Sequence, residues 1–198
     1  MSARRRLAVE VIQSSAMDCG PAALKCLLEG YGLSVSYDRL RAACQTDVDG
    51  TSIDTLEEVA VALGLEAEQT LVPVDHLFAP EAAALPAIAV VRSPGGLTHF
   101  VVLWSHAAGM VQVMDPASGR HFTRQDALLR RLFVHRMPAP ADALRAWLGS
   151  SEFLGPLRRR ARALGIKGAA ADAWISEATA DATLLGLARL DAVVRMTA

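Results

Sequence analysis

Residues 11–24 of the chain read Val11-Ile-Gln-Ser-Ser-Ala-Met-Asp-Cys-Gly-Pro-Ala-Ala-Leu24. The stretch ends a short apolar run, and Pro21 suits the first turn of a helix, where a missing N–H costs nothing. Apolar residues then recur at helical spacing as far as Tyr31, and Gly32 lies where a left-handed residue would end the helix. This pattern predicts a helix from about Cys19 to Tyr31, with Cys19 at its N-terminus.

The position of Cys19 suits a nucleophile. At a helix N-terminus the dipole and the free N–H groups favour a thiolate over a thiol. Taken alone, however, a cysteine beside an apolar helix is more often a small buried hydrophobe. A catalytic interpretation therefore requires a base, a group that orients the base and an oxyanion hole elsewhere in the chain.

Composition narrows the class of protein. A chain of 198 residues can form one domain with a real core plus an appendage. The net charge of −1 gives no general indication of nucleic-acid binding, and the basic clusters at residues 4–6, 130–131 and 158–162 are typical of solvated helix faces or tails. No apolar stretch reaches the roughly 18 residues of a membrane-spanning helix, and no signal-peptide core follows the basic N-terminus.

The three cysteines have no metal-ligand or disulfide pattern. Cys19, Cys26 and Cys44 lack the CxxC spacing of zinc or redox sites, and the latter two are expected to fill the core. We therefore expect a reducing, cytoplasmic setting. No cofactor and no metal ion are predicted.

Two further helices are expected after the first. Ser36 is placed to cap the second, and Thr51 with Asp54 resembles a capping pair for the third, which Gly64 ends. The turn at residues 47–51 has a spacing faintly like that of a calcium loop. It lacks a third acidic ligand and the closing glutamate, so we reject a metal site there.

The second half of the sequence changes from a helical to a strand pattern. Strands are predicted at residues 86–92, 98–104 and 110–114, with turns at residues 93–96 and 115–119. A short helix is expected over residues 123–131 and a last strand over residues 132–137. Helices followed by an antiparallel sheet define an α+β fold.

A domain boundary is expected at Pro138-Ala-Pro140, because strand patterns end there. Residues 1–138 are predicted to form one domain. Residues 139–198 are rich in alanine, leucine and arginine with helical periodicity, and they predict a C-terminal extension of two or three helices.

Among the five histidines, His99 is the best candidate for a base, because it begins an apolar strand directly after a Gly-Gly turn. Asp115 ends the next strand, so a hairpin would bring the two side chains to the same end, where the carboxylate would orient the imidazole. Asp115 is equally well explained as the first residue of an Asp-Pro turn. Gln13 offers an amide N–H to an oxyanion, although a polar loop residue is the simpler interpretation of Gln13 alone.

Three blocks of the sequence resemble the bacteriocin-processing cysteine peptidases, which are the double-glycine peptidase domains of peptidase-containing ABC transporters. The blocks are Gln13-Ser-Ser-Ala-Met-Asp-Cys19-Gly-Pro-Ala, Thr98-His99-Phe-Val-Val and Val113-Met-Asp115-Pro-Ala-Ser-Gly. They occur in the family's order over about residues 7–138. The resemblance implies a papain-like fold with Cys19 in a helical half, His99 and Asp115 in a sheet half, and Gln13 in the oxyanion hole.

The resemblance also implies a reaction and partners. The reaction is cleavage of a leader peptide after a Gly-Gly or Gly-Ala pair, coupled to peptide export. The partners are a precursor peptide with an amphipathic helical leader and the membrane and ATPase domains of an ABC transporter, with no nucleic acid. The chain is expected to be either a standalone peptidase or, the alternative that we favour, an excised portion of such a transporter, which would act at the cytoplasmic face of the inner membrane. Candidate residues for the groove that binds the leader lie in the third helix and in residues 66–78. Arg158–Arg162 are an alternative contact for a transporter or membrane surface.

Two other functions compete with leader cleavage. A peptidase-like binding module would hold a leader or cargo peptide without cutting it, and relatives of that kind are expected to lack Cys19. Another papain-like enzyme, such as a deamidase or transpeptidase, would give products of a different mass.

Overall fold

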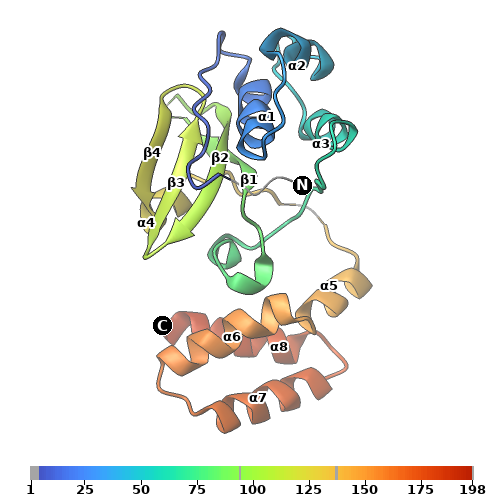
Figure 1. Cartoon of the computed structure of the whole chain (residues 1–198). Coiled ribbons are helices and arrows are strands. Elements are labelled where there is room, and N and C mark those ends of the chain that lie inside the picture. The colour runs from blue at the N-terminus through green and yellow to red at the C-terminus, as the bar shows by residue number, and fades with distance from the viewer. Residues whose placement is uncertain (1–4, 94, 137, 198) are drawn as a thin grey trace. The chain divides into compact units, whose positions relative to one another are not determined.

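The computed structural model describes residues 5–93, 95–136 and 138–197, which form two compact units. The first unit comprises Met1–Val74 and Ala84–Val134, and the second comprises Asp75–Ala83 and His135–Ala198. The second unit therefore contains a short internal segment, residues 75–83, in addition to the C-terminal helices (Figure 1).

The first helix of the first unit, α1 (Cys19–Gly30), begins at the predicted residue. Tyr31 is its C-cap, and Gly32 follows with a φ of 84°, as expected for the left-handed residue that ends a helix. Gly30 permits a close approach, because a Cβ at this position would lie 2.1 Å from Cη2 of the buried Trp104. The predicted helix is confirmed.

The second and third helices, α2 (Tyr37–Ala43) and α3 (Ile53–Ala62), also form. Ser36 is the N-cap of α2, but its side chain makes no capping hydrogen bond. The predicted Thr51–Asp54 pair does not cap α3. Ser52 accepts from the Thr55 N–H instead, because the Thr51 hydroxyl is paired with Thr46 and the Asp54 carboxylate accepts from a glutamine amide.

Four antiparallel strands form one sheet in the order β1-β2-β3-β4. The strands are β1 (Ala87–Arg92), β2 (Thr98–Ala107), β3 (Met110–Asp115) and β4 (Gly119–Arg124). The first three match the predicted strands. The α+β prediction of a helical half followed by an antiparallel sheet is confirmed.

The end of the sheet differs from the prediction. Residues 119–124 form β4 at full register with β3, and only the short α4 (Gln125–Leu129) remains of the helix expected over residues 123–131. The strand expected over residues 132–137 does not form in the described part, where Leu132 makes an isolated bridge to Val91, and residue 137 lies outside the described residues. The Gly-Arg-His-Phe-Thr-Arg sequence of β4 has no apolar face, so its strand pairing left no periodic signal.

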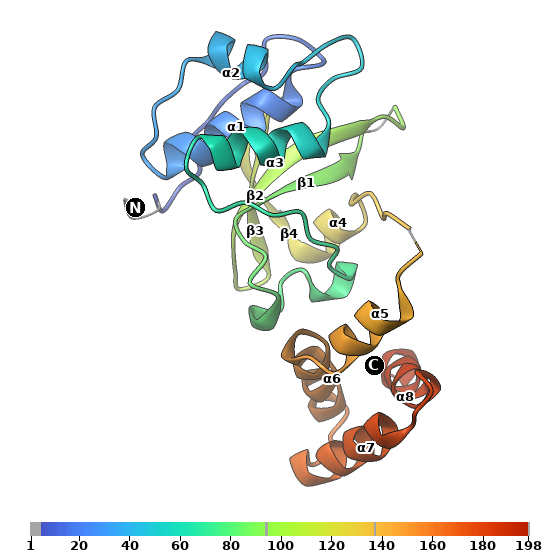
Figure 2. The same cartoon turned by 90° about the vertical axis from the view of Figure 1, so that its right-hand side faces the viewer.

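The core of the first unit lies on both sides of α1, which packs against β2 and against α2 and α3 (Figure 2). The cluster between α1 and the sheet includes Ala22, Ala23, Cys26, Val102, Trp104 and Met114. A second cluster among the three helices includes Leu24, Leu28, Leu40, Cys44 and Leu56. The helix that carries Cys19 is thus held rigidly against the sheet.

The chain before α1 is an extended segment. The Ala8 N–H donates to the Gln112 side chain at 2.6 Å, and Arg120 donates to the Ala8 carbonyl at 2.7 Å. The Gln13 N–H donates to the Pro116 carbonyl at 2.9 Å. These three contacts hold the segment against β3, β4 and their connecting turn.

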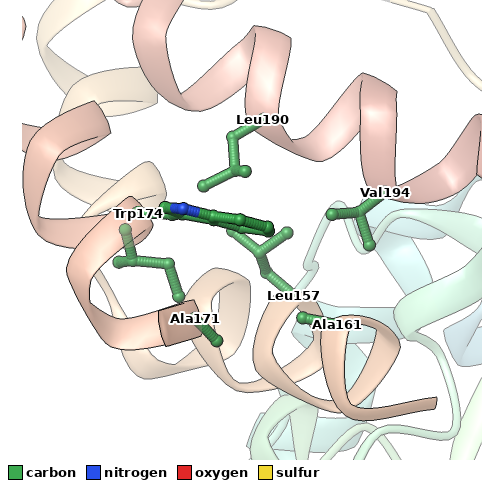
Figure 3. A pocket seen from close by; sticks show the side chains of 7 residues that line it. Leu157, Ala161, Ala171, Trp174, Leu190 and Val194 are labelled. Carbon is green, nitrogen blue, oxygen red and sulfur yellow. The ribbon is translucent and has the colours of Figure 1, made fainter. Parts of the chain in front are cut away.

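The C-terminal part of the second unit contains four helices within its described residues, one or two more than predicted. They are α5 (Ala141–Leu148), α6 (Ser151–Ala163), α7 (Gly168–Ala180) and α8 (Leu185–Thr197). Gly149 ends α5, and Gly165, with a φ of 79°, follows α6. Trp174 lies across a small apolar pocket between α6, α7 and α8 (Figure 3). The pocket has a volume of about 10 Å³, which leaves no room for a ligand.

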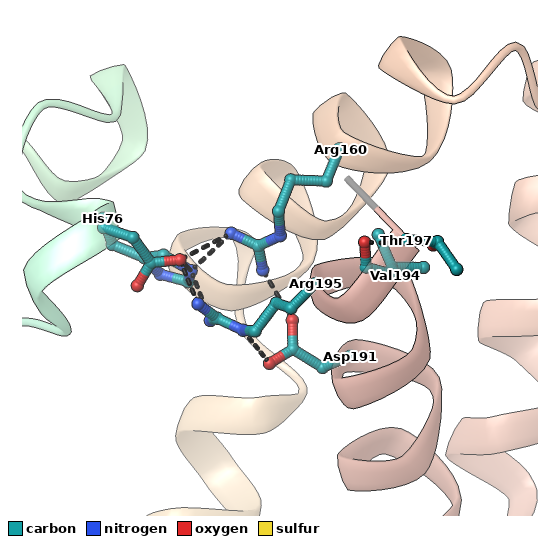
Figure 4. Close-up of polar contacts among 7 residues, drawn as sticks. His76, Arg160, Asp191, Val194, Arg195 and Thr197 are labelled. Atoms are coloured by element: carbon teal, nitrogen blue, oxygen red, sulfur yellow. Dashed lines mark hydrogen bonds and ion pairs between the residues drawn. The ribbon is translucent and has the colours of Figure 1, made fainter.

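The internal segment 75–83 joins this unit through ion pairs. Arg160 lies 3.0 Å from Asp75 and 2.5 Å from Asp191, and Arg195 pairs with the same two carboxylates (Figure 4). His76 is buried beside them, with its Nε2 3.2 Å from the Arg160 guanidinium. The arginines expected on a solvated face are thus partly engaged in ion pairs.

Within the described residues, no helix is long and apolar enough to cross a membrane. No group of three or more His, Cys, Asp or Glu side chains in this part of the chain is arranged to hold a metal ion.

Candidate active site

Cys19 is the first residue of α1 and its side chain is half-buried. Its sulfur is within hydrogen-bonding reach of the His99 ring and of the backbone N–H groups of Phe100 and Gly20. Burial by itself raises the pKa of the thiol. These hydrogen bonds and the positive charge of His99 outweigh that effect, so the pKa of Cys19 is lowered below its usual value.

His99 is placed by the β2–β3 hairpin. Val102 pairs with Met114, so Asp115 at the end of β3 lies beside the start of β2. The His99 Nε2 is 2.7 Å from the Asp115 Oδ1, and both side chains are largely buried. Because Nε2 is engaged by Asp115, Nδ1 is the ring nitrogen left for the Cys19 sulfur.

The two partners of His99 set its charge. Hydrogen bonds to Asp115 and to Cys19 raise the pKa of His99 to about 9, against a smaller lowering by burial. Burial raises the pKa of the Asp115 carboxyl, but the hydrogen bonds from His99 and from the Ala117 N–H lower it by more. The net result is a pKa below the usual value. These shifts move the equilibrium toward a thiolate, an imidazolium and a carboxylate in sequence.

Gln13 is fixed through its backbone to the residue that follows Asp115. Its N–H donates to the Pro116 carbonyl, while its side-chain Oε1 is buried without a hydrogen-bond partner among the described residues. The amide oxygen is thus not engaged in an internal network. Gln13 is therefore tied to the turn that carries Asp115.

Asp18 is a buried carboxylate that the sequence analysis did not single out. It directly precedes Cys19, accepts from the Ser14 hydroxyl at 2.6 Å and from the Arg41 Nε at 2.8 Å, and is fully enclosed. Burial raises the pKa of Asp18, but hydrogen bonds from Ser14 and Ser15 and the charge of Arg41 bring it below its usual value. The only local signal was an aspartate at a helix start, because Arg41 lies 23 residues away.

The other candidate side chains lie elsewhere. Cys26 and Cys44 are fully buried, and burial raises the pKa of their thiols to about 12 and about 11, which makes them poor nucleophiles. The expectation that they fill the core is confirmed. His76 belongs to the second unit, and His121 lies in β4 near the Gly119 carbonyl.

The geometry matches a class of enzyme, the cysteine peptidases with a papain-like fold. Residues 9–132 match the model of the Peptidase C39 family, which is more than half of the chain. The chain therefore belongs to the Peptidase C39 family, a family of cysteine peptidases, in agreement with the resemblance of its sequence.

Several relatives are processing and transport proteins. The lactococcin-G-processing and transport ATP-binding protein LagD of Lactococcus lactis subsp. lactis is 30% identical over 110 residues, which is 56% of this chain and 16% of that protein. The transport/processing ATP-binding protein ComA of Streptococcus pneumoniae is 29% identical over 144 residues, or 73% of this chain and 18% of that protein. The chain thus spans less than a fifth of these transporters. A shorter, uncharacterized protein of Methanothermobacter marburgensis is 33% identical over 60% of this chain and 78% of its own length.

Two solved structures share the fold. The peptidase domain of Streptococcus ComA, a bifunctional ABC transporter of a quorum-sensing pathway, superposes with a TM-score of 0.57 at 25% identity, over 62% of this chain and 90% of that one. A double glycine motif protease from an AMS/PCAT transporter, solved in complex with the leader peptide, superposes with a TM-score of 0.54 at 23% identity. The match covers 67% of this chain and 90% of that one. The predicted papain-like fold is confirmed.

Proposed function

We propose that the chain is a cysteine endopeptidase that cleaves the leader from a ribosomally made precursor peptide after a Gly-Gly or Gly-Ala pair. The observation that carries this proposal is the series Cys19, His99 and Asp115, in which the pKa of the thiol is lowered and that of the imidazole is raised to about 9. Membership of the Peptidase C39 family supports the same reaction.

In the acylation step, the Cys19 thiolate attacks the carbonyl carbon of the second residue of the Gly-Gly or Gly-Ala pair, which is the last residue of the leader. The His99 imidazolium then gives a proton to the leaving amine, so that the peptide bond breaks and a thioester forms. Asp115 holds the imidazole in the orientation that presents Nδ1 to the sulfur and stabilises its positive charge.

The negative charge on the carbonyl oxygen needs donors in each step. Gln13, through its side-chain amide, and the backbone N–H of Cys19 are the groups to which we assign this oxyanion. A water molecule, deprotonated by neutral His99, then attacks the thioester and releases the leader with a free carboxylate. Cys19, His99, Asp115 and Gln13 are thus the proposed catalytic residues.

Small leader residues would suit a narrow passage between the helical and sheet halves that admits no side chain larger than a methyl group. The remainder of the leader would bind as an amphipathic helix on an apolar surface. We propose that residues 1–138 perform this cleavage in the cytoplasm, as part of an ABC transporter that exports the product. Residues 139–198 would form a helical extension that docks to other parts of that transporter.

Two precursor peptides test the proposal directly. One carries a Gly-Gly pair at the end of its leader, and its matched control carries Gly-Val, so that only one side chain differs. We expect cleavage of the first by the full chain and at least about 10²-fold slower cleavage of the second, measured by mass spectrometry. Equal cleavage of both peptides would contradict the proposed specificity, and cleavage of neither would contradict the proposed function.

A further inference from the structure

The buried Asp18 carboxylate does not do what an aspartate at the start of a helix usually does. Asp18 is the N-cap of α1, yet its side chain makes no capping hydrogen bond. An N-cap aspartate normally accepts from the N–H of the second or third helical residue and has extended backbone angles. Asp18 has a φ of −91° and a ψ of 12°, so its backbone lies outside the extended region typical of such a cap.

Side-chain donors outside the first turn of α1 hold the carboxylate instead. The Ser14 hydroxyl donates to Oδ2 at 2.6 Å, and the Arg41 Nε donates to Oδ1 at 2.8 Å, so each oxygen has its own donor. Arg41 comes from α2 and keeps about half of its side chain exposed, whereas Asp18 is fully buried. A buried carboxylate needs such a partner, because an unpaired one is strongly disfavoured.

The diverted carboxylate leaves the first turn of α1 available to Cys19. The N–H of Gly20, the second residue of the helix, is within reach of the Cys19 sulfur, together with the N–H of Phe100. A capping carboxylate would compete for this donor. It would also place a negative charge beside the thiolate, and a like charge at short range disfavours the ionised form.

We propose that Arg41 and Ser14 form a positioning device that holds the Asp18 carboxylate away from the N-terminus of α1 and neutralises it, so that the Cys19 thiolate keeps the N–H of Gly20. The role in catalysis rests on the proposed function, whereas the effect on the thiolate does not. The Ser14–Asp18 contact also closes the loop between Gln13 and Cys19, so the same device fixes the spacing between the nucleophile and its proposed oxyanion donor.

The pH dependence of Cys19 alkylation tests this proposal in the full chain. The reaction with iodoacetamide is followed at Cys19 by peptide mass spectrometry from about pH 4 to pH 10, since only the thiolate reacts. Arg41→Leu leaves the carboxylate uncompensated, and we expect the pKa of Cys19 to rise by about 1 unit, which slows alkylation about 10-fold below that pKa. Asp18→Asn removes the negative charge and retains Arg41, so the pKa should stay or fall.

The different responses of the two variants distinguish a positioning role from a merely structural one. If Arg41 and Asp18 only stabilised the loop, both variants would disturb the site and raise the pKa of Cys19 together, and this result would overturn the proposal. An unchanged pKa in Arg41→Leu would also overturn it. Arg39→Leu, an exposed arginine of the same helix, is the matched control and should leave the profile unchanged.

Two further measurements guard against misfolding and against failure of the proposed function. Circular dichroism checks each variant, and if Arg41→Leu does not fold, the sign of the change in Asp18→Asn decides alone: a rise overturns the proposal. Arg41→Lys restores the charge and should recover most of the wild-type profile.

In leader cleavage, Arg41→Leu should lower kcat about 10-fold with little change in KM. If the wild type cleaves no leader, the proposed function fails while the alkylation profiles still decide this inference.

Discussion

The pair formed by His99 and Asp115 makes a quantitative prediction about activity at high pH. The pKa of His99 is about 9 against an ordinary 6.5, a difference of about 2.5, which corresponds to roughly 3 kcal/mol in favour of the imidazolium. The hydrogen bond to Asp115 is the largest cause of that rise. Replacing this carboxylate by a neutral amide in Asp115→Asn should therefore lower the pKa of His99 by about 1 to 2 units.

The sign follows from the proton that His99 must carry. Because the raised pKa keeps the ring protonated up to about pH 9, cleavage by the wild type should persist to that pH and fall above it. In Asp115→Asn the ring loses its proton at lower pH, so the alkaline limb of kcat/KM should move down by about 1 to 2 units. The maximal kcat should also fall by at least about 10²-fold, since the amide no longer enforces the ring orientation.

The assay is a pH series of leader cleavage from about pH 5 to pH 10, with peptide fragments quantified by mass spectrometry. Asp126→Asn is the matched control, because Asp126 is an exposed carboxylate paired with Arg124. The control should keep the wild-type profile. An alkaline limb that stays at the wild-type pH in Asp115→Asn, with kcat within a few-fold, would refute the role assigned to this pair.

Three other substitutions test separate parts of the structure. Gln13→Ala should lower kcat about 10²-fold with little effect on KM, because it removes a donor used mainly in the transition state. Steady-state kinetics test this prediction, and a normal kcat would refute it. Gly30→Ala should destabilise the chain by about 1 to 3 kcal/mol, because the new methyl group would clash with Trp104. Chemical denaturation measures this loss, and Gly149→Ala is the control, because its methyl group would make only ordinary van der Waals contacts. Asp191→Asn should lower the stability of the second unit by about 1 to 3 kcal/mol, because two arginines lose a shared carboxylate. Faster amide hydrogen exchange confined to α6 and α8 would support this prediction, and unchanged exchange would contradict it.

Local patterns were sufficient to predict the elements that carry the site. The start of α1 was marked by Pro21 and a helical apolar stripe, and its end by Gly32. The hairpin was marked by two apolar runs separated by a short turn, which is why His99 and Asp115 could be expected at one end of it. Periodicity and turn chemistry act over a few residues, and these features depend on nothing longer.

Features held by distant residues were missed. The strand β4 has no apolar alternation, and its main-chain bonds to β3 define it. The sequence pattern therefore predicts a helix over residues 123–131 that is longer than α4. The partnership of Asp18 with Arg41 joins two helices, and no local pattern connects residues 23 positions apart. Residues 75–83 also gave no sign of the ion pairs that join them to α6 and α8.

We propose that this chain hydrolyses a double-glycine precursor with the Cys19 thiolate. The most direct measurement is the intact mass of such a precursor after incubation with the full wild-type chain and with Cys19→Ala. We expect two fragments from the wild type, whose masses sum to that of the precursor plus one water and which separate after the second glycine. We expect no fragments from Cys19→Ala, although this variant folds normally. Equal cleavage by the folded Cys19→Ala variant would contradict the claim.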